Sequence, residues 1–257
     1  MEAPSPMPVE PIKVRRLYQE VADQLLRLIA TGEFKVGERL PSERELAVSL
    51  QVSRPTIREA MIALELAAAV QIRSGAGVFV CEPPSQQSTA DAGPGPFELL
   101  EARAHIEGEA AALAAQRIDE VELRALRKAN ETMNGLADAR ASTEEADREF
   151  HQIVARATRN SAMAAAVEQL WEFRARMPMW QGLHETIREI KKRRDWSDDH
   201  HAVLDHREIT EALAARDAGG AREAMRAHLE RVSGVLLAAS ELKILDLDHQ
   251  FENLSQE

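Results

Sequence analysis

The segment DREFH holds an acidic and an imidazole side chain at a spacing that suits metal ligation. Asp147 and His151 are four residues apart, so both project from the same face of one helix. A carboxylate and an imidazole in this arrangement can share a metal ion, or they can form an ordinary surface hydrogen bond. The pair alone does not decide between these two interpretations.

Two further histidines favour the metal. His206 and His228 each lie 11 residues from Asp217, in the turn-like segment RDAGG. If that segment joins two antiparallel helices, the equal rise along both brings the two imidazoles to the same level. Three imidazoles and one carboxylate suit Zn²⁺, with Ni²⁺ or Mn²⁺ as other first-row candidates. The competing interpretation is that both histidines are ordinary, partly buried polar residues.

A second set of side chains, in the N-terminal third, could contact nucleic acid. Arg54 and Arg58 are four residues apart, so they share a helical face beside the apolar stripe, where they could reach phosphates or guanine bases. Ser53 and Thr56 add hydroxyl groups. Arg44 lies near the start of the preceding helix, whose free N–H groups could hold a phosphate. The alternative is a small amphipathic module whose arginines only solvate its surface.

Periodicity predicts the elements that must position these side chains. Apolar residues at helical spacing predict a helix that ends near Gly32, a second that opens with the capping box of Ser42 and Glu45, and a third that begins at Ser53. Two short strands then flank the glycine-bearing turn at 74–77. Three helices followed by a β-hairpin are the order of a winged helix-turn-helix.

Proline marks the domain boundaries. Eight of the eleven prolines lie in residues 1–11 and 83–96, and proline at this density continues neither a helix nor a central strand. We therefore expect a disordered tail at 1–11, a DNA-binding domain at 12–82 and a linker at 83–96. The pattern beyond the linker is helical almost throughout, which predicts an all-α bundle of six or seven helices at 97–245 and a C-terminal tail at 246–257.

Charge separates the two predicted domains as well. The 257 residues carry a net charge of −11, which by itself argues against binding to polyanions. Residues 12–80, however, hold ten basic and eight acidic residues, whereas 83–257 hold 22 and 32, and all eight histidines lie beyond residue 104. No apolar run approaches the roughly 20 residues that span a bilayer. The first residues lack the features of a signal peptide, and the single Cys81 cannot form an internal disulfide. We therefore expect a cytoplasmic protein without membrane contact.

The N-terminal motifs resemble those of a known family. The segment from Lys35 to Val80 contains L-P-S-E-R-E-L-A followed by V-S-R-x-T-I-R-E-A, and it closely resembles the DNA-binding domain of the GntR family of bacterial transcription regulators. The resemblance implies a homodimer that reads a pseudo-palindromic operator on double-stranded DNA. It also implies DNA contacts at seven positions: Arg44, Ser53, Arg54, Thr56, Arg58 and, in the wing, Ser74 and Gly75.

The C-terminal region resembles the FCD ligand-binding domain found in the FadR branch of the same family. The family motif is D-x-x-x-H followed by two histidines 22 positions apart, and four residues match it: Asp147, His151, His206 and His228. The resemblance implies a metal-dependent sensor of a small carboxylate, with Arg103 as a contact to that carboxylate. Arg103 could instead pair with Glu107 in a solvated i,i+4 contact. Asn160 could cap the following helix or bond ligand hydroxyl groups.

Segments around the aromatic residues narrow the subgroup. DAGPGPFELLEAR, WEFRARMPMW and RRLYQ resemble segments of hexuronate-responsive regulators, which repress glucuronate and galacturonate catabolic genes and release DNA on binding a uronic acid. Trp171, Arg174, Met179 and Trp180 could line a sugar-acid pocket, although an aromatic stripe of this kind is more often core.

These patterns predict a mainly α protein that is a ligand-controlled repressor and not an enzyme. Three alternatives stay open. The effector could be another carboxylate, such as gluconate or lactate; the metal could only stabilise an interaction module; or the chain could be a metal-dependent hydrolase that carries a DNA-binding domain. The hydrolase is disfavoured because no H-E-x-x-H motif occurs and because a catalytic metal usually has fewer than four protein ligands. A metal held by four protein groups can still expand its coordination to accept the oxygen of a small carboxylate.

Overall fold

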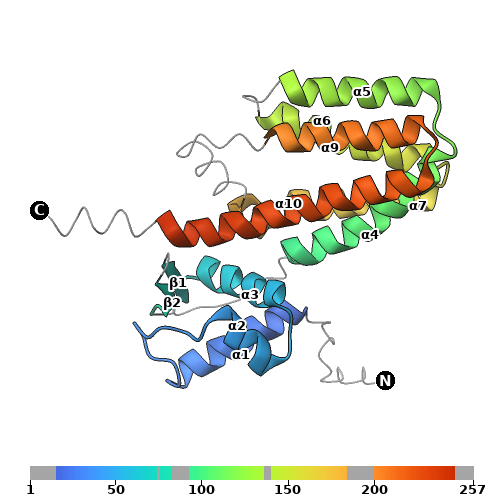
Figure 1. Cartoon of the computed structure of the whole chain (residues 1–257). Coiled ribbons are helices and arrows are strands. Elements are labelled where there is room, and N and C mark those ends of the chain that lie inside the picture. The colour runs from blue at the N-terminus through green and yellow to red at the C-terminus, as the bar shows by residue number, and fades with distance from the viewer. Residues whose placement is uncertain (1–15, 74–75, 83–92, 136–139, 184–198, 247–257) are drawn as a thin grey trace, which may run out of the picture.

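The computed structural model describes residues 16–73, 76–82, 93–135, 140–183 and 199–246 (Figure 1). Both predicted tails, apart from Asp246, lie outside these ranges, as do residues 83–92 of the predicted linker and the predicted wing contacts Ser74 and Gly75. None of the described helices is both long and apolar enough to cross a membrane. The described residues form a mainly helical protein with a small N-terminal module and a larger helical bundle.

The N-terminal module is the predicted winged helix-turn-helix. It consists of α1 (Leu17–Ala30), α2 (Glu43–Leu50), α3 (Arg54–Leu66), β1 (Val70–Arg73) and β2 (Gly77–Val80). The two strands pair antiparallel, with Val70 opposite Val80 and Arg73 opposite Gly77. At Gly77 the backbone has φ +111°, a conformation that residues other than glycine rarely adopt.

The predicted helix starts are confirmed by their caps. The Oγ atom of Ser42 accepts a hydrogen bond from the Glu45 amide at 3.3 Å, and the Glu45 carboxylate accepts one from the Ser42 amide at 2.8 Å. Ser53 accepts a bond from the Thr56 amide at 3.2 Å at the start of α3. These contacts satisfy amide groups that the first turn of a helix leaves without partners. Ile57, Ala60, Met61 and Leu64 of α3 are buried, which fixes this helix against the module's core.

The C-terminal region is a helical bundle, as predicted. It comprises α4 (Pro96–Ala115), α5 (Glu120–Gly135), α6 (Arg140–Ala157), α7 (Ser161–Arg176), α9 (Asp199–Ala214) and α10 (Ala218–Asp246). In Figure 1, α4 and α10 run side by side along the lower edge, and α5 forms the opposite edge beyond α6 and α9. Small residues on α4 permit this close packing, since a Cβ at Gly108 would lie 2.9 Å from the Arg226 side chain of α10. The buried faces of these helices create the interior in which the candidate ligands lie.

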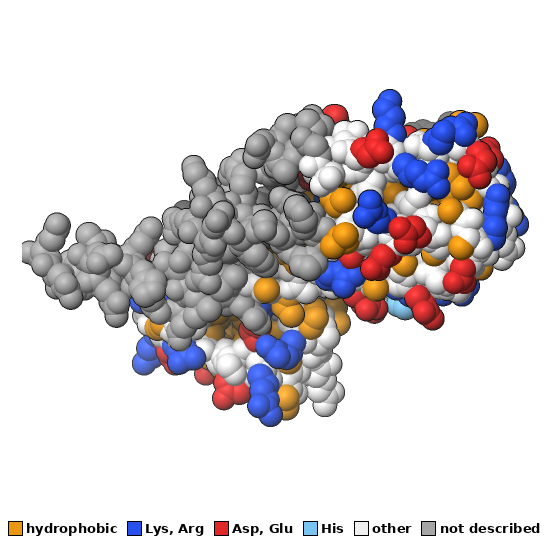
Figure 2. All heavy atoms as spheres, turned by 45° about the horizontal axis from the view of Figure 1, so that its top comes forward, with side chains coloured by type: hydrophobic (Ala, Val, Ile, Leu, Met, Phe, Trp, Pro, Cys, Tyr) orange, Lys and Arg blue, Asp and Glu red, His pale blue; other side chains and the backbone are white. Residues whose placement is uncertain are grey.

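The two modules touch each other. Helix α3 packs against α4, and the C-terminal half of α10 extends over β1 (Figure 1). Over the part of the bundle that is drawn in colour in Figure 2, basic and acidic side chains are intermixed.

Candidate metal centre

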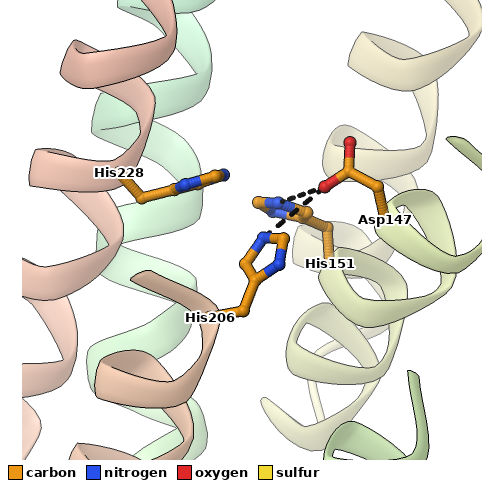
Figure 3. A group of neighbouring side chains, drawn as sticks. All are labelled: Asp147, His151, His206 and His228. Carbon is orange, nitrogen blue, oxygen red and sulfur yellow. Dashed lines mark ion pairs between the residues drawn. The ribbon is translucent and has the colours of Figure 1, made fainter. Parts of the chain in front are cut away.

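Three helices bring the four predicted ligands together (Figure 3). Asp147 and His151 project from α6, His206 from α9 and His228 from α10. One ligand atom of each residue lies within 4.8 Å of those of the other three. Asp147 Oδ1 is 3.5 Å from Nε2 of both His151 and His206. The three histidines are buried, whereas the Asp147 side chain is partly exposed.

The turn between α9 and α10 sets the level of His206 and His228. Asp217 accepts a hydrogen bond from the Gly220 amide at 2.9 Å through its side chain, and its carbonyl accepts one from the Ala221 amide. The chain therefore reverses at Asp217, and the imidazole centroids of the two histidines are 4.5 Å apart. This is the arrangement that the equal spacing of 11 residues predicts.

Neighbouring carboxylates orient two of the imidazoles. Nδ1 of His151 contacts the Glu107 carboxylate of α4, and Nδ1 of His228 lies 3.3 Å from Asp205 Oδ2. A carboxylate that accepts a hydrogen bond from Nδ1–H leaves the lone pair on Nε2. Within the described part of the chain, Nε2 of His151 and both ring nitrogens of His206 accept or donate no hydrogen bond. Buried imidazole nitrogens without such partners, beside a carboxylate, fit the donor set of a first-row metal ion.

The protonation states also suit a cation site. Burial, followed by the charge of His228, holds the pKa of His206 well below its ordinary range, and burial lowers the pKa of His228. Burial would also lower the pKa of His151, but the Glu107 charge outweighs it and raises this pKa. Desolvation of the carboxyl group would raise the pKa of Asp147, but the contact with His151 and the charge of Arg174 outweigh it and hold this pKa well below its ordinary range. The cluster thus offers an ionised carboxylate and two neutral imidazoles.

Cationic and aromatic side chains form one wall next to the cluster. The Arg103 guanidinium lies 4.2 Å from the Trp171 ring centroid, and that of Arg174 lies 4.4 Å from Trp171 and 4.9 Å from Trp180. Arg174 donates to Asp147 Oδ2 at 3.0 Å. Among the described residues, nothing accepts a hydrogen bond from Nη2 of Arg103, although this atom is buried. An anion bound beside the four candidate ligands would therefore contact the guanidinium groups of both arginines.

Two alternatives from the sequence are decided by contacts. Arg103 does pair with Glu107, with Nε to Oε1 at 2.6 Å. The alternative of a solvated contact is wrong, because both side chains are only 2% exposed. The pair is buried because α6 and α7 cover this face of α4. Asn160 caps α7, where its Oδ1 accepts bonds from the Ala162 and Met163 amides at 3.1 and 3.2 Å. The aromatic stripe is buried, as core residues are, and Met179 is 1% exposed.

The predicted DNA-contact residues lie at the start of α3 and on α2. Arg44, Ser53 and Arg54 are exposed. The sequence places Arg58 on an open face beside Arg54, but in the structure Arg58 is 4% exposed. Its Nε donates to Glu43 Oε1 at 2.8 Å and its Nη1 to the Leu237 carbonyl of α10 at 3.3 Å. Helix α10 covers this turn of α3, which the periodicity of α3 alone cannot reveal.

Sequence reasoning missed Asp205 and the role of Glu107. Asp205 precedes His206 on α9, and its carboxylate contacts His228 and Arg231 of α10. A carboxylate next to a predicted histidine ligand is a weak sequence signal, because its contact with a second histidine depends on how the partner helix packs.

Two family models match this chain. "Bacterial regulatory proteins, gntR family" matches residues 17–80, and "FCD domain" matches residues 98–231. The chain belongs to the GntR family of bacterial regulators. It is a DNA-binding transcription regulator with an FCD domain, and its relatives are named as regulators, in agreement with the expected absence of enzymatic function.

Curated relatives cover nearly the whole of this GntR protein. The "Uxu operon transcriptional regulator" of Escherichia coli (strain K12) is 38% identical over 91% of this chain and 92% of its own length. The "Exu regulon transcriptional regulator" of the same strain is 40% identical over 86% and 85%. The "Uxu operon regulator" of Haemophilus influenzae is 32% identical over 90% and 85%. The resemblance to GntR regulators with an FCD domain is thereby confirmed.

Proposed function

We propose that this GntR regulator is a repressor that a uronic acid releases from DNA, and that the acid binds beside a divalent metal ion. The observation that carries the proposal is the cluster of Asp147 and three buried histidines beside the Arg103 and Arg174 guanidinium groups. Among the described residues, Nε2 of His151 and both ring nitrogens of His206 find no hydrogen-bond partner. The names of the Uxu and Exu relatives support a hexuronate as effector.

The residues assigned to the metal are Asp147, His151, His206 and His228, and we favour Zn²⁺ because three imidazoles and one carboxylate suit it. When bound, the ion supplies a positive charge that attracts the carboxylate oxygen of a ligand. Arg103 would donate from Nη2 to the second carboxylate oxygen. Trp180, stacked on Arg174, would close the side of the pocket toward α7, whereas Asn160 is used as a helix cap.

At the other end of the molecule, we assign the operator contacts to α2, α3 and the wing. Arg44 and Arg54 would pair with phosphate or guanine, and the first turn of α3, with Ser53 and Thr56, would enter the major groove. Arg58 would join them only after leaving Glu43 and α10. Ser74 and Gly75 stay assigned to the wing contact. A homodimer would place two such heads on a pseudo-palindromic site.

A thermal-unfolding series tests the sensor. Zn²⁺-loaded protein is heated with glucuronate, galacturonate, gluconate or lactate, and with glucose as the neutral control. We expect a uronic acid to raise the melting temperature and glucose to leave it unchanged, because a ligand that binds only the folded state stabilises it. His228→Ala should abolish the shift, whereas His105→Ala, at an exposed histidine, should keep it. If only gluconate or lactate raised the melting temperature, that acid would replace the uronic acid as the proposed effector. No rise with any acid, despite bound Zn²⁺, would refute the effector proposal.

A further inference from the structure

A single glutamate of the DNA-reading helix is buried between the two modules. Glu59 of α3 is 3% exposed. Its Oε1 atom accepts hydrogen bonds from the backbone amides of Phe97 at 2.8 Å and Glu98 at 3.0 Å. Both amides belong to the first turn of α4, the helix that carries Arg103. The carboxylate therefore links the reading helix directly to the sensor domain.

Glu59 takes the place of the missing cap of α4. A helix leaves its first amides without partners inside the helix, and the side chain of the N-cap residue usually accepts from the second or third of them. The N-cap residue here is Gly95, which has no side chain, and Pro96 follows it. Phe97 and Glu98 are the second and third helical residues, so Glu59 accepts the two bonds that an N-cap side chain would accept.

The absence of a side chain at Gly95 permits this contact. Its backbone has φ −67°, a conformation that any residue adopts, so no strain requires glycine there. A Cβ at this position would, however, lie 2.2 Å from the carboxyl group of Glu59. Glycine is thus needed for the approach of the carboxylate, and a methyl group at this position would force it away.

The modules also share apolar packing, because buried residues of both belong to one hydrophobic core, and further hydrogen bonds join them. Tyr18 of α1 donates to the Gly93 carbonyl at 3.0 Å, and Arg58 donates to the Leu237 carbonyl of α10. Beside Glu59 lies a cavity of about 590 Å³, lined by Ser53 and Thr56 of α3 among other residues of α1, α4 and α10. Glu59 itself lines this cavity, so its hydrogen bonds to α4 lie beside space that the apolar packing does not fill.

We propose that Glu59 is a positioning residue that fixes the DNA-reading helix α3 on the first turn of the sensor helix α4. Only six residues, about 9 Å of helix, separate Phe97 from Arg103. A displacement of α4 at the sensor site would therefore carry α3 with it. This consequence rests on the proposed function, whereas the joint between α3 and α4 does not.

Distances between spin labels test the joint without metal, ligand or DNA. Labels are placed at two exposed positions, Thr31 of the N-terminal module and Arg124 of α5, by Thr31→Cys and Arg124→Cys in a Cys81→Ser background. The labelled full-length protein is diluted with unlabelled protein so that only distances within one chain are measured. We expect a narrow distribution for the parent, and a broad or displaced one for Glu59→Ala and Gly95→Ala, which disrupt the joint from opposite sides.

Two further variants separate positioning from general structural damage. Glu59→Gln keeps an Oε1 acceptor and should restore the narrow distribution, and Glu101→Gln, at an exposed glutamate of α4, should match the parent. The amides of Phe97 and Glu98 should exchange hydrogen roughly tenfold faster in Glu59→Ala and at the parental rate in Glu59→Gln. Parental distributions in both Glu59→Ala and Gly95→Ala, or a failure of Gln to rescue, would overturn the proposal. Neither result depends on the effector, so a failure of the Glu59 proposal can be distinguished from a failure of the proposed sensor function.

Discussion

At the residue scale, Glu107 ties the candidate metal site to the candidate carboxylate site. One oxygen of its buried carboxylate accepts from Arg103 Nε and the other contacts Nδ1 of His151. Burial would raise the pKa of Glu107, but the charges of Arg103 and His151 outweigh it and lower this pKa to about 2. Glu107 is therefore an anion throughout the physiological range, and it holds His151 in the tautomer that turns Nε2 toward Asp147.

Replacing Glu107 by Gln should weaken Zn²⁺ binding about 10–100-fold, because an amide of the same size holds the His151 tautomer less firmly. Competition with a chromophoric chelator at constant pH measures this affinity. Glu109→Gln is the matched control, since Glu109 lies on the same helix but is exposed and pairs with Arg222. Equal Zn²⁺ affinity in Glu107→Gln and the parent would show that Glu107 does not orient a ligand.

The sequence predicts the four residues of this candidate metal site better than the contacts that support them. Helical spacing pairs Asp147 with His151, and the Asp217 turn pairs His206 with His228. The resemblance to the FCD domain then predicts that the two pairs form one site, and the structure places the four side chains together. The burial of the Arg103–Glu107 pair could not be predicted, because an i,i+4 pair has the same spacing on an exposed and on a buried face. Whether such a pair is solvated depends on the helices that cover it.

At the element scale, local signals were sufficient where the contacts are local. The capping box of Ser42 and Glu45 and the cap at Ser53 are formed by residues three apart, so sequence predicts them well. The cap of α4 comes from Glu59, 38 residues before Phe97, and no pattern around α4 indicates it. The same holds for Arg58, whose burial follows from α10.

The burial of Glu59 should make the stability of the protein depend on pH. Burial is the main cause that raises the Glu59 pKa from 4.5 to about 7, and the charges of Glu98 and Glu101 add to it. A carboxyl group whose pKa is raised by folding binds its proton more tightly in the folded state. The resulting stabilisation is complete below about pH 4.5 and is lost as the pH rises to about 7.

Compared with Glu59→Gln, which cannot titrate, the parent should therefore lose about 3 kcal/mol of unfolding free energy between pH 4.5 and 7, as an order of magnitude. Urea unfolding of metal-free protein at several pH values and one protein concentration measures it. Other titrating groups are common to both proteins and cancel in the difference. Parallel pH profiles for the two proteins would mean that Glu59 is not desolvated in solution.

At the scale of the whole molecule, the distribution of functions between the two domains was predictable, but their relative placement was not. Charge, proline and helical periodicity separate residues 12–80 from the bundle. The docking of the N-terminal module against the bundle includes polar contacts of Tyr18, Arg58 and Glu59 with backbone groups. Backbone groups carry no sequence signature, so these contacts become visible only in three dimensions.

The joint at Glu59 predicts how a ligand signal would cross the molecule. Zn²⁺ with glucuronate should displace α4 through Arg103, and in the parent the distance between labels at positions 31 and 124 should shift to a new, equally narrow distribution. In Glu59→Ala the same ligands should still raise the melting temperature, because the sensor site is intact, but the distance distribution should stay broad and unshifted. An equal shift in both proteins would show that the signal passes by another route, for example through the Arg58 contact with α10.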